Sequence, residues 1–297
     1  MTGIGTMFVK RKSAFGLALI FAAAMLTPGA ATPVPRERSG QTPDLRADYT
    51  VYVGGLIVAE GSMSATLNGE GYRLQNKLGS AGLPRKFWDA RWVMTSEGRI
   101  EGGKLHPGRF AFTSTEDNET KHRLLVYDAS GTPTLSFDPP LSPEDEARTS
   151  AYERINTLDP VSALLLPVVA AGNPCNRKLP VFDGKRRYDL QLIFDRVATV
   201  TTRDKGYSGE AIRCKVRFIP HTGMERAKLT TMLQRRDDTW IWLVPVEDTN
   251  LYFPVRIQMR TPIGGAVMDV VKLSRNETKD TASLAANPAA DPNGRQP

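Results

Sequence analysis

The amino-acid sequence predicts a mainly β protein: a long antiparallel curved sheet, shaped as a half-barrel or open barrel, around one central helix. Apolar and polar residues alternate with a period of two along most of the chain, as in strands with one buried and one solvated face. Turn sequences such as Asn68-Gly69 separate these segments, and one segment carries clear helix signals. A long sheet must curl or pack against another layer to bury its apolar face, so a two-sheet sandwich is the alternative.

The first half of the chain is predicted to be a meander of antiparallel strands. Asn68-Gly69 has the composition of a two-residue hairpin turn between two of them. The proline-rich acidic stretch DPPLSPEDEART, residues 138–149, is predicted as an internal connector that follows these strands. The predicted strands of this half are 49–53, 63–67, 72–78, 87–94, 109–115 and 121–127.

The central helix is predicted to begin near Asp159. Aspartate is a favourable N-cap residue, and Pro160 stands at the first helical position, where proline is preferred. Pro167 is expected to end or kink the helix, because proline lacks a backbone N–H. The apolar residues that would share one helix face are Val161, Leu164, Leu165 and Val168.

Period-two alternation resumes after this helix and continues almost to the end of the chain. Residues 48–275 are therefore predicted to form a single β-rich domain. The remaining residues, 276–297, are rich in Ala, Asn, Asp and Pro and are predicted to be a disordered tail. The predicted strands of the second half are 188–194, 212–218, 240–246, 255–260 and 266–273.

Residues 1–31 have the composition of an export signal. Basic residues precede an apolar run that is too short to span a bilayer, and small residues follow it. Cleavage is expected near Ala30 or Ala31, and residues 32–47 are expected to be a flexible lead-in. These features predict a periplasmic protein.

The charge pattern argues against a nucleic-acid partner. The formal net charge is +7, but the basic residues are scattered rather than gathered in one stripe. No second long apolar run follows the signal, so contact with a membrane is expected to be peripheral at most. The expected assembly state is a monomer.

Cys175 and Cys214 are the only cysteines of the chain. Two cysteines in an exported protein usually pair, so we expect one structural disulfide between them. Neither lies in a Cys-x-x-Cys motif, and Cys214 belongs to an apolar row, which disfavours redox activity.

No motif for catalysis, metal binding or cofactor binding stands out. The three histidines, His106, His122 and His221, lack ligand spacing, and no nucleophile elbow or phosphate loop occurs. The expectation is a protein without enzymatic activity, metal or cofactor, with an undetected hydrolase as the less favoured alternative.

Two groups of residues are candidate binding sites. Lys185, Arg186 and Arg187 follow the turn at Asp183-Gly184 and form a candidate anion or glycan patch, because guanidinium groups pair well with phosphate and carboxylate. A structural interpretation is that they solvate the start of a strand. The second group could line an apolar groove for an acyl chain or stack on sugars, or could simply fill the core. It consists of Trp88, Trp92, Trp240 and Trp242.

The segment 158–190, with DPVSALL, a cysteine and then PVFDGKRRYDL, resembles an exported bacterial family, domain of unknown function 3108. The stretches YTVYVGGLIVAEGSM, YRLQNKLGSAGL and SEGRIEGGKLHPGRF fit it too, so that the resemblance covers residues 48–275. It implies a periplasmic curved sheet similar to lipoprotein carriers, which hold acyl chains between a half-barrel and helices. It transfers no catalytic residues. The expected function is therefore non-enzymatic binding of lipid, lipoprotein or another amphipathic ligand; the alternative is a protein for envelope integrity that binds a protein or glycan.

Overall fold

The computed structural model describes residues 45–68, 70–168, 173–223, 238–247, 249–261 and 263–275. These residues form one antiparallel sheet of 14 strands in the order β7-β6-β5-β4-β3-β2-β1-β14-β13-β12-β11-β10-β9, with β8 paired to β13. The path is open, with β7 and β9 at its ends, so the sheet is not closed into a barrel. The strands are β1 Leu45–Val53, β2 Leu56–Asn68, β3 Gly71–Ser80, β4 Ala90–Glu101, β5 Lys104–Glu116, β6 Glu119–Tyr127, β7 Pro133–Asp138, β8 Leu166–Pro167, β9 Arg177–Phe182, β10 Arg187–Thr201, β11 Ser208–Thr222, β12 Trp240–Val246, β13 Leu251–Thr261 and β14 Gly264–Arg275.

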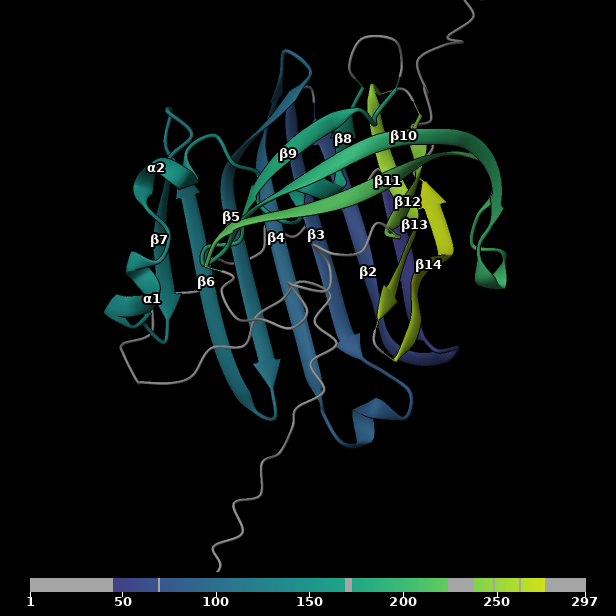
Figure 1. The fold of residues 1–297 in the computed structure, drawn as a ribbon, viewed down its shortest axis with the longest axis horizontal. Coiled ribbons are helices and arrows are strands. Elements are labelled where there is room, and N and C mark those ends of the chain that lie inside the picture. The colour runs from purple at the N-terminus through teal and green to yellow at the C-terminus, as the bar shows by residue number, and fades with distance from the viewer. Residues whose placement is uncertain are drawn as a thin grey trace, which may run out of the picture.

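The sheet is strongly curved, which confirms the predicted half-barrel architecture. Figure 1 shows β2 to β6 side by side, with β9 and the long strands β10 and β11 crossing them at a steep angle. Register shifts within the ladders, for example at Glu97/Gly98 and Trp242/Leu243, are bulges that bend the strands. One continuous sheet buries its own apolar face in this way, so the sandwich alternative is not adopted.

The predicted central helix is wrong in type and length. Residues 158–167, called the central segment below, contain one 3-10 turn, η2 at Ser162–Leu164, followed by β8. The N-cap prediction is correct in kind, because Asp159 accepts hydrogen bonds from the backbone N–H of Val161 and Ser162, both at 2.9 Å. Pairing of Leu166 and Pro167 with β13 then replaces helical hydrogen bonding, and Pro167 has no N–H with which to continue a helix.

Two short helices lie in and just after the predicted connector 138–149. Helix α1 spans Pro143–Ala147, and the Ser142 side chain caps it by accepting from the N–H of Asp145. Helix α2 spans Ala151–Arg154 and begins with a capping box between Ser150 and Glu153. The two remaining 3-10 turns are η1 Pro84–Lys86 and η3 Arg203–Lys205.

The β9 edge of the sheet is covered by the chain itself. The Leu158 N–H donates to the Pro180 carbonyl at 2.8 Å, and the Phe182 N–H donates to the Leu158 carbonyl at 2.9 Å. Leu158 and Val181 thereby form a parallel bridge outside the named strands. The central segment is thus attached to the second half of the sheet, through β9 at its start and β13 at its end.

The tip of the β10–β11 hairpin packs closely on β14. A Cβ atom at Gly206 would lie 2.3 Å from the Val271 carbonyl carbon and 2.4 Å from the Val270 oxygen, so only glycine fits there. The β9–β11 strip is therefore fixed at its far end as well as along β12.

Several predictions concern residues outside the described ranges. These are the export signal 1–31, most of the lead-in 32–47 and the tail 276–297. Strand β1 begins at Leu45, inside the segment expected to be the lead-in. Among the described residues, no helix is long and apolar enough to cross a membrane.

Candidate functional site

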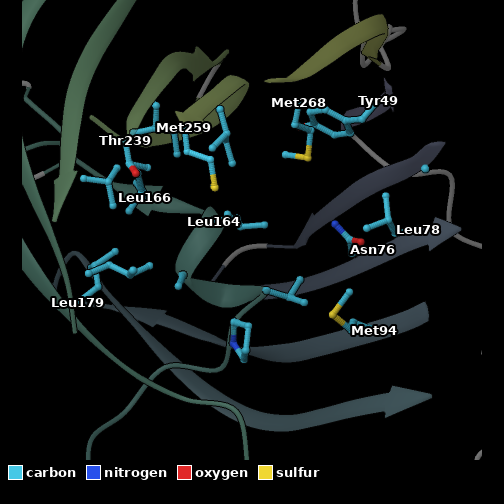
Figure 2. A pocket seen from close by; sticks show the side chains of 18 of the residues that line it. Tyr49, Asn76, Leu78, Met94, Leu164, Leu166, Leu179, Thr239, Met259 and Met268 are labelled. Atoms are coloured by element: carbon cyan, nitrogen blue, oxygen red, sulfur yellow. The ribbon is translucent and has the colours of Figure 1, made fainter. Parts of the chain in front are cut away.

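An apolar cavity of about 170 Å³ lies inside the curved sheet. Figure 2 shows side chains from both halves of the sheet and from the central segment pointing into it. Polar members of the wall are few, and Asn76 and Lys77 on β3 are two of them. The residues that line the cavity are Tyr49, Gly61, Ser62, Asn76, Lys77, Leu78, Met94, Pro160, Val161, Ala163, Leu164, Leu166, Leu179, Tyr188, Leu190, Leu192, Val216, Thr239, Ile241, Ile257, Met259 and Met268.

Alternation along the strands positions these side chains. On β13 and β14, Ile257 pairs with Met268, and both side chains face the cavity. Ile241 on β12 pairs with Ile257 and extends the same row. Every second residue of a strand faces one side of the sheet, so an alternating sequence is enough to build this wall.

Three methionines, Met94, Met259 and Met268, contribute to the wall from three different strands. Methionine has an unbranched, polarizable side chain that adapts to ligands of varied shape. Figure 2 shows the Met259 and Met268 side chains and Leu164 of the central segment extending into the same cavity. The wall can therefore adjust more readily than one built from β-branched residues.

A buried polar network holds the central segment against the first half of the sheet. Asp159 is fully buried, and its Oδ2 accepts hydrogen bonds from Ser96 Oγ at 2.7 Å and Ser162 Oγ at 2.6 Å. Tyr72 Oη lies 2.9 Å from Ser162 Oγ. Burial raises the pKa of the Asp159 carboxyl, and the hydrogen bonds from Ser162 oppose part of that rise. The network fixes one wall of the cavity.

None of the four tryptophans lines this cavity. Trp88 was predicted to lie in a strand, but it lies in the connection between η1 and β4. Its ring centroid is 5.3 Å from that of Trp92. Trp92 Nε1 donates to Glu116 at 3.2 Å.

Trp240 and Trp242 on β12 pack against cations instead. The Arg213 guanidinium lies 4.3 Å from the Trp240 ring centroid and 5.7 Å from that of Trp242. They alternate with Ile241, which faces the cavity, so they occupy the opposite side of β12. The four tryptophans that were candidates for an apolar groove therefore do not line a common cavity.

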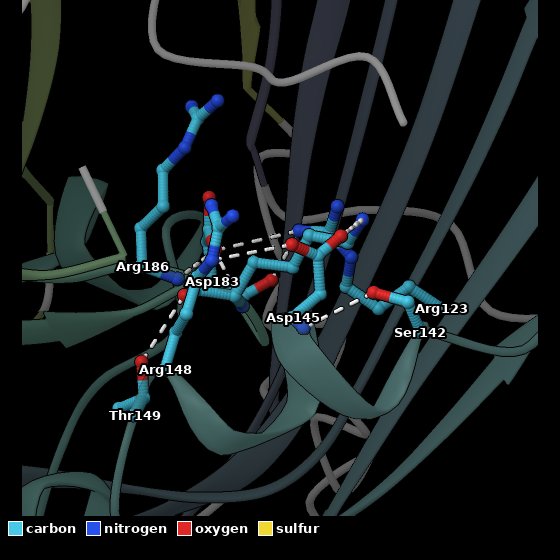
Figure 3. A network of polar contacts seen from close by, with 8 residues as sticks. Arg123, Ser142, Asp145, Arg148, Thr149, Asp183 and Arg186 are labelled. Atoms are coloured by element: carbon cyan, nitrogen blue, oxygen red, sulfur yellow. Dashed lines mark hydrogen bonds and ion pairs between the residues drawn. The ribbon is translucent and has the colours of Figure 1, made fainter. Parts of the chain in front are cut away.

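The three basic residues of the candidate anion patch diverge from one another. Arg187 donates to Asp189 at 2.6 Å and to the Glu153 carbonyl at 3.1 Å. The Lys185 ammonium lies 4.0 Å from Asp145, and burial, followed by the positive charge of Arg123, lowers its pKa to about 8. Figure 3 shows the Arg186 side chain extending away from Asp183.

Arg123 on β6 is a polar anchor that sequence reasoning missed. It is 8% exposed, and its guanidinium lies 5.3 Å from the Phe112 ring centroid and 5.5 Å from that of Phe137. It donates to the Asp183 carbonyl, and its Nη1 lies 3.5 Å from Asp183 Oδ1, as Figure 3 shows. Burial lowers the pKa of Arg123, and the carboxylate of Asp183 opposes that shift. The contact joins β6 to the β9–β10 turn across the open side of the sheet.

Arg123 and Lys185 also line a second, more polar pocket of about 190 Å³. Asp145, Ser142 and Asp138 contribute oxygen atoms to it. It is lined by residues of β5, β6 and β7 and of the start of α1, whereas the wall of the apolar cavity in this half of the sheet comes from β1 to β4.

Cys175 and Cys214 lie within disulfide-bonding distance, with their Cα atoms 5.9 Å apart. Both are fully buried, in the smaller of two apolar clusters, beside Leu166 and Leu243. The pair ties the loop that precedes β9 to β11. Among the described residues, no group of His, Cys, Asp and Glu has the arrangement of a metal site.

Comparison with known proteins identifies related sequences and similar folds. The family model described as protein of unknown function, DUF3108, matches residues 48–271. A β-barrel-like protein of the domain of unknown function DUF1849 from Brucella abortus is similar at 12% identity and a TM-score of 0.46, covering 80% of this chain and 99% of that one. A "putative lipoprotein" from Parabacteroides distasonis ATCC 8503 is similar at 10% identity and a TM-score of 0.33, covering 79% and 96%. No curated protein matches the chain.

Proposed function

This chain belongs to the DUF3108 family, and from that premise we propose that it is a non-enzymatic protein of the periplasm that binds an alkyl chain in the cavity of its curved sheet. The ligand class is a lipid, a lipoprotein acyl group or another amphipathic molecule. The observation that supports the proposal most is the almost wholly apolar wall between the two halves of the sheet and the central segment. Binding would be driven by removal of ligand surface from water, at about 25 cal/mol per Å² before ordering costs.

The size of the cavity limits what it can hold. An apolar cavity of about 150 Å³ in a protein core stays dry and accepts benzene. At about 170 Å³, the present cavity accommodates a section of one alkyl chain rather than a whole lipid. A longer ligand would require the methionines of the wall to move, which their flexible side chains allow.

A cavity-narrowing variant tests the proposal. An uncharged fluorescent alkyl probe should bind the wild-type chain, and a fatty acid should displace it. Met268→Trp should weaken the binding of the probe about tenfold, because it fills the space that the probe needs. Val267→Trp, the neighbouring change on β14 at a residue that does not line the cavity, should bind as wild type does.

The proposal fails if the probe does not bind the wild-type chain, or if Met268→Trp binds it unchanged. A second test is mass spectrometry of the small molecules that copurify with the protein from its native compartment, which identifies the natural ligand. Copurification of lipid with wild type and its loss from Met268→Trp is the expected pattern.

The polar pocket supports a second candidate function, the binding of an envelope glycan or protein. Arg123 and Lys185 could pair there with a carboxylate or phosphate of such a partner. A pull-down with peptidoglycan tests it: Lys185→Glu should lower retention several-fold, whereas the exposed Lys104→Glu should not. Equal retention of both variants would exclude this pocket.

A further inference from the structure

One end of the sheet exposes a group of large apolar side chains. In the strand order, β4, β3, β2, β1, β14 and β13 are consecutive and antiparallel, so the β3–β4, β1–β2 and β13–β14 connections all lie at the same end. Figure 1 shows the β3–β4 and β13–β14 connections together at the lower end of the view. We call the exposed side chains there the apolar rim: Leu56 at 64%, Ile57 at 37%, Leu83 at 59%, Phe87 at 82% and Ile263 at 53% exposure.

Contacts between neighbouring turns make the rim continuous. Gly54 N donates to the Gly265 carbonyl at 2.9 Å, which joins the β1–β2 and β13–β14 turns. Ala81 N donates to the Val58 carbonyl at 3.0 Å, and a Cβ at Gly82 would lie 2.5 Å from the Ile57 oxygen, so the β3–β4 connection packs on β2. The rim is therefore one surface and not scattered apolar residues.

The opposite end of the same strands has a different character. Its β2–β3 and β4–β5 turns present polar and charged residues, Asn68, Glu70, Glu101 and Lys104, in place of large apolar ones. Among the turns of these six strands, exposed large apolar side chains thus gather at one end, whereas the others of the described residues lie elsewhere in the fold: Val126, Tyr152, Ile155, Phe194 and Val197. A contiguous exposed apolar surface marks a place where a folded protein contacts a partner.

The charge of the rim indicates what that partner is. Arg85 and Lys86 directly precede Phe87, and residues 54–57, 81–88 and 263–265 include no acidic residue. Arg85 Nε lies 3.7 Å from Asp89, whereas no ion pair joins Lys86 to another described residue. Exposed aromatic and aliphatic side chains beside cations are the composition of surfaces that enter the interface of a bilayer with anionic lipids.

We propose that the apolar rim docks on the surface of a bilayer that contains anionic phospholipid. Phe87, Leu83, Leu56 and Ile263 enter the boundary between head groups and acyl chains, and Lys86 pairs with lipid phosphate. The acidic β5–β6 turn lies one hairpin further along this end, where Asp117 N donates to the Asp89 carbonyl at 3.1 Å. Docking is therefore tilted toward β1 and β14, which keeps Asp117 in water.

Part of the wall of the apolar cavity lies close to the apolar rim. Met259 lies close to the end of β13, Met268 close to the start of β14 and Leu78 close to the end of β3, so these cavity residues are near the rim. Docking would bring this end of the cavity to the bilayer. The docking surface itself does not require the cavity to hold lipid, and the two proposals can fail separately.

Vesicle flotation tests the docking. The chain purified in its natural form should float with vesicles of phosphatidylcholine and phosphatidylglycerol, and less with phosphatidylcholine alone. Phe87→Ser should weaken partition about tenfold, the effect of withdrawing one aromatic side chain from the interface. Tyr152→Ser on α2 is the matched control, because Tyr152 is 85% exposed and lies away from the rim, and it should float as wild type does. All variants have the same N-terminal residues as wild type, so any membrane affinity of those residues does not contribute to the difference in flotation.

Lys86→Glu should abolish the preference for vesicles with phosphatidylglycerol. Binding of the alkyl probe in the cavity should be unchanged in Phe87→Ser, which separates docking from cavity binding. Flotation of Phe87→Ser equal to wild type, or an equal loss in Tyr152→Ser, would overturn the proposal. So would a wild-type chain that ignores vesicles but binds an envelope protein through Phe87.

Discussion

Ser96 on β4 donates a hydrogen bond of 2.7 Å to Asp159, which joins the first half of the sheet to the central segment. Asp159 also accepts from two backbone N–H groups, so one carboxylate fixes both the fold of the segment and its position. The wall of the apolar cavity therefore depends on a small polar network.

Removing parts of this network should destabilise the protein. Ser96→Ala should lower the free energy of unfolding by about 1 kcal/mol, because it removes one hydrogen bond to the buried Asp159 carboxyl. Asp159→Ala should lower it by about 3 kcal/mol, because several buried donors then lose their acceptor. Urea denaturation measures both. Thr95→Ala on the opposite face of β4 is the control and should cost less than about 0.5 kcal/mol. Equal losses for Thr95→Ala and Asp159→Ala would show that the network adds nothing.

The half-buried Lys185 makes the free energy of unfolding depend on pH in the alkaline range. Its pKa is lowered to about 8 in the folded chain, mainly by burial, whereas the unfolded chain keeps the ordinary value of 10.5. Between these values the unfolded state binds more protons, so the free energy of unfolding should rise with pH across this window. Below pH 8 the ammonium is charged in both states, so the folded state carries the full unfavourable free energy of burying that charge.

Lys185→Met should remove that rise and stabilise the protein at pH 7 by on the order of 1 kcal/mol, a figure reduced for the partial exposure of the side chain. Urea denaturation at several pH values gives the difference between variant and wild type. The exposed Lys104→Met should leave the pH profile unchanged. A difference that stays constant from pH 7 to 10.5 would contradict the assignment.

Oxidation of the cysteine pair should contribute substantially to stability. The two cysteines are separated by 39 positions, and closing such a loop restricts the unfolded chain by about 4 kcal/mol in the loop-entropy model. The double substitution of Cys175 and Cys214 by alanine should lower the denaturation midpoint by a corresponding amount. Thiol labelling of the native protein should detect no free cysteine; labelling of both would refute the disulfide.

The curved sheet was predictable because its signal is local. Alternation in segments such as 188–194 assigns each side chain to a face before any pairing is known. The central segment was mispredicted because the signals at Asp159 and Pro160 specify how a turn starts and not how long it continues. Whether a helix followed was decided by strand pairing of Leu166 with Tyr252, a contact between residues far apart in the sequence.

The candidate sites were harder to predict for the same reason. Alternation places Ile241 and Trp242 on opposite faces of β12, but it cannot say which face meets the cavity. The tryptophans were candidates because aromatic rings can line a groove or stack on sugars, whereas the wall of the cavity uses mainly methionine, leucine and isoleucine. The contact of Lys185 with Asp145 depends on tertiary structure, whereas Asp189 lies two residues from Arg187 on β10, so that pairing was a local signal. The capping box of Ser150 and Glu153 was a local signal that could have revealed α2.

Leu158 occupies hydrogen-bonding groups of Pro180 and Phe182 on the outer edge of β9, so a second copy of the chain would have to displace it to pair along the whole strand. Unprotected strand edges are the templates on which folded proteins polymerise. At the other end of the sheet, β7 begins with Pro133, which has no N–H to offer a newcomer. Both edges of this broad open sheet thus carry a feature that disfavours strand addition by another molecule, a bridging residue at β9 and a proline at β7.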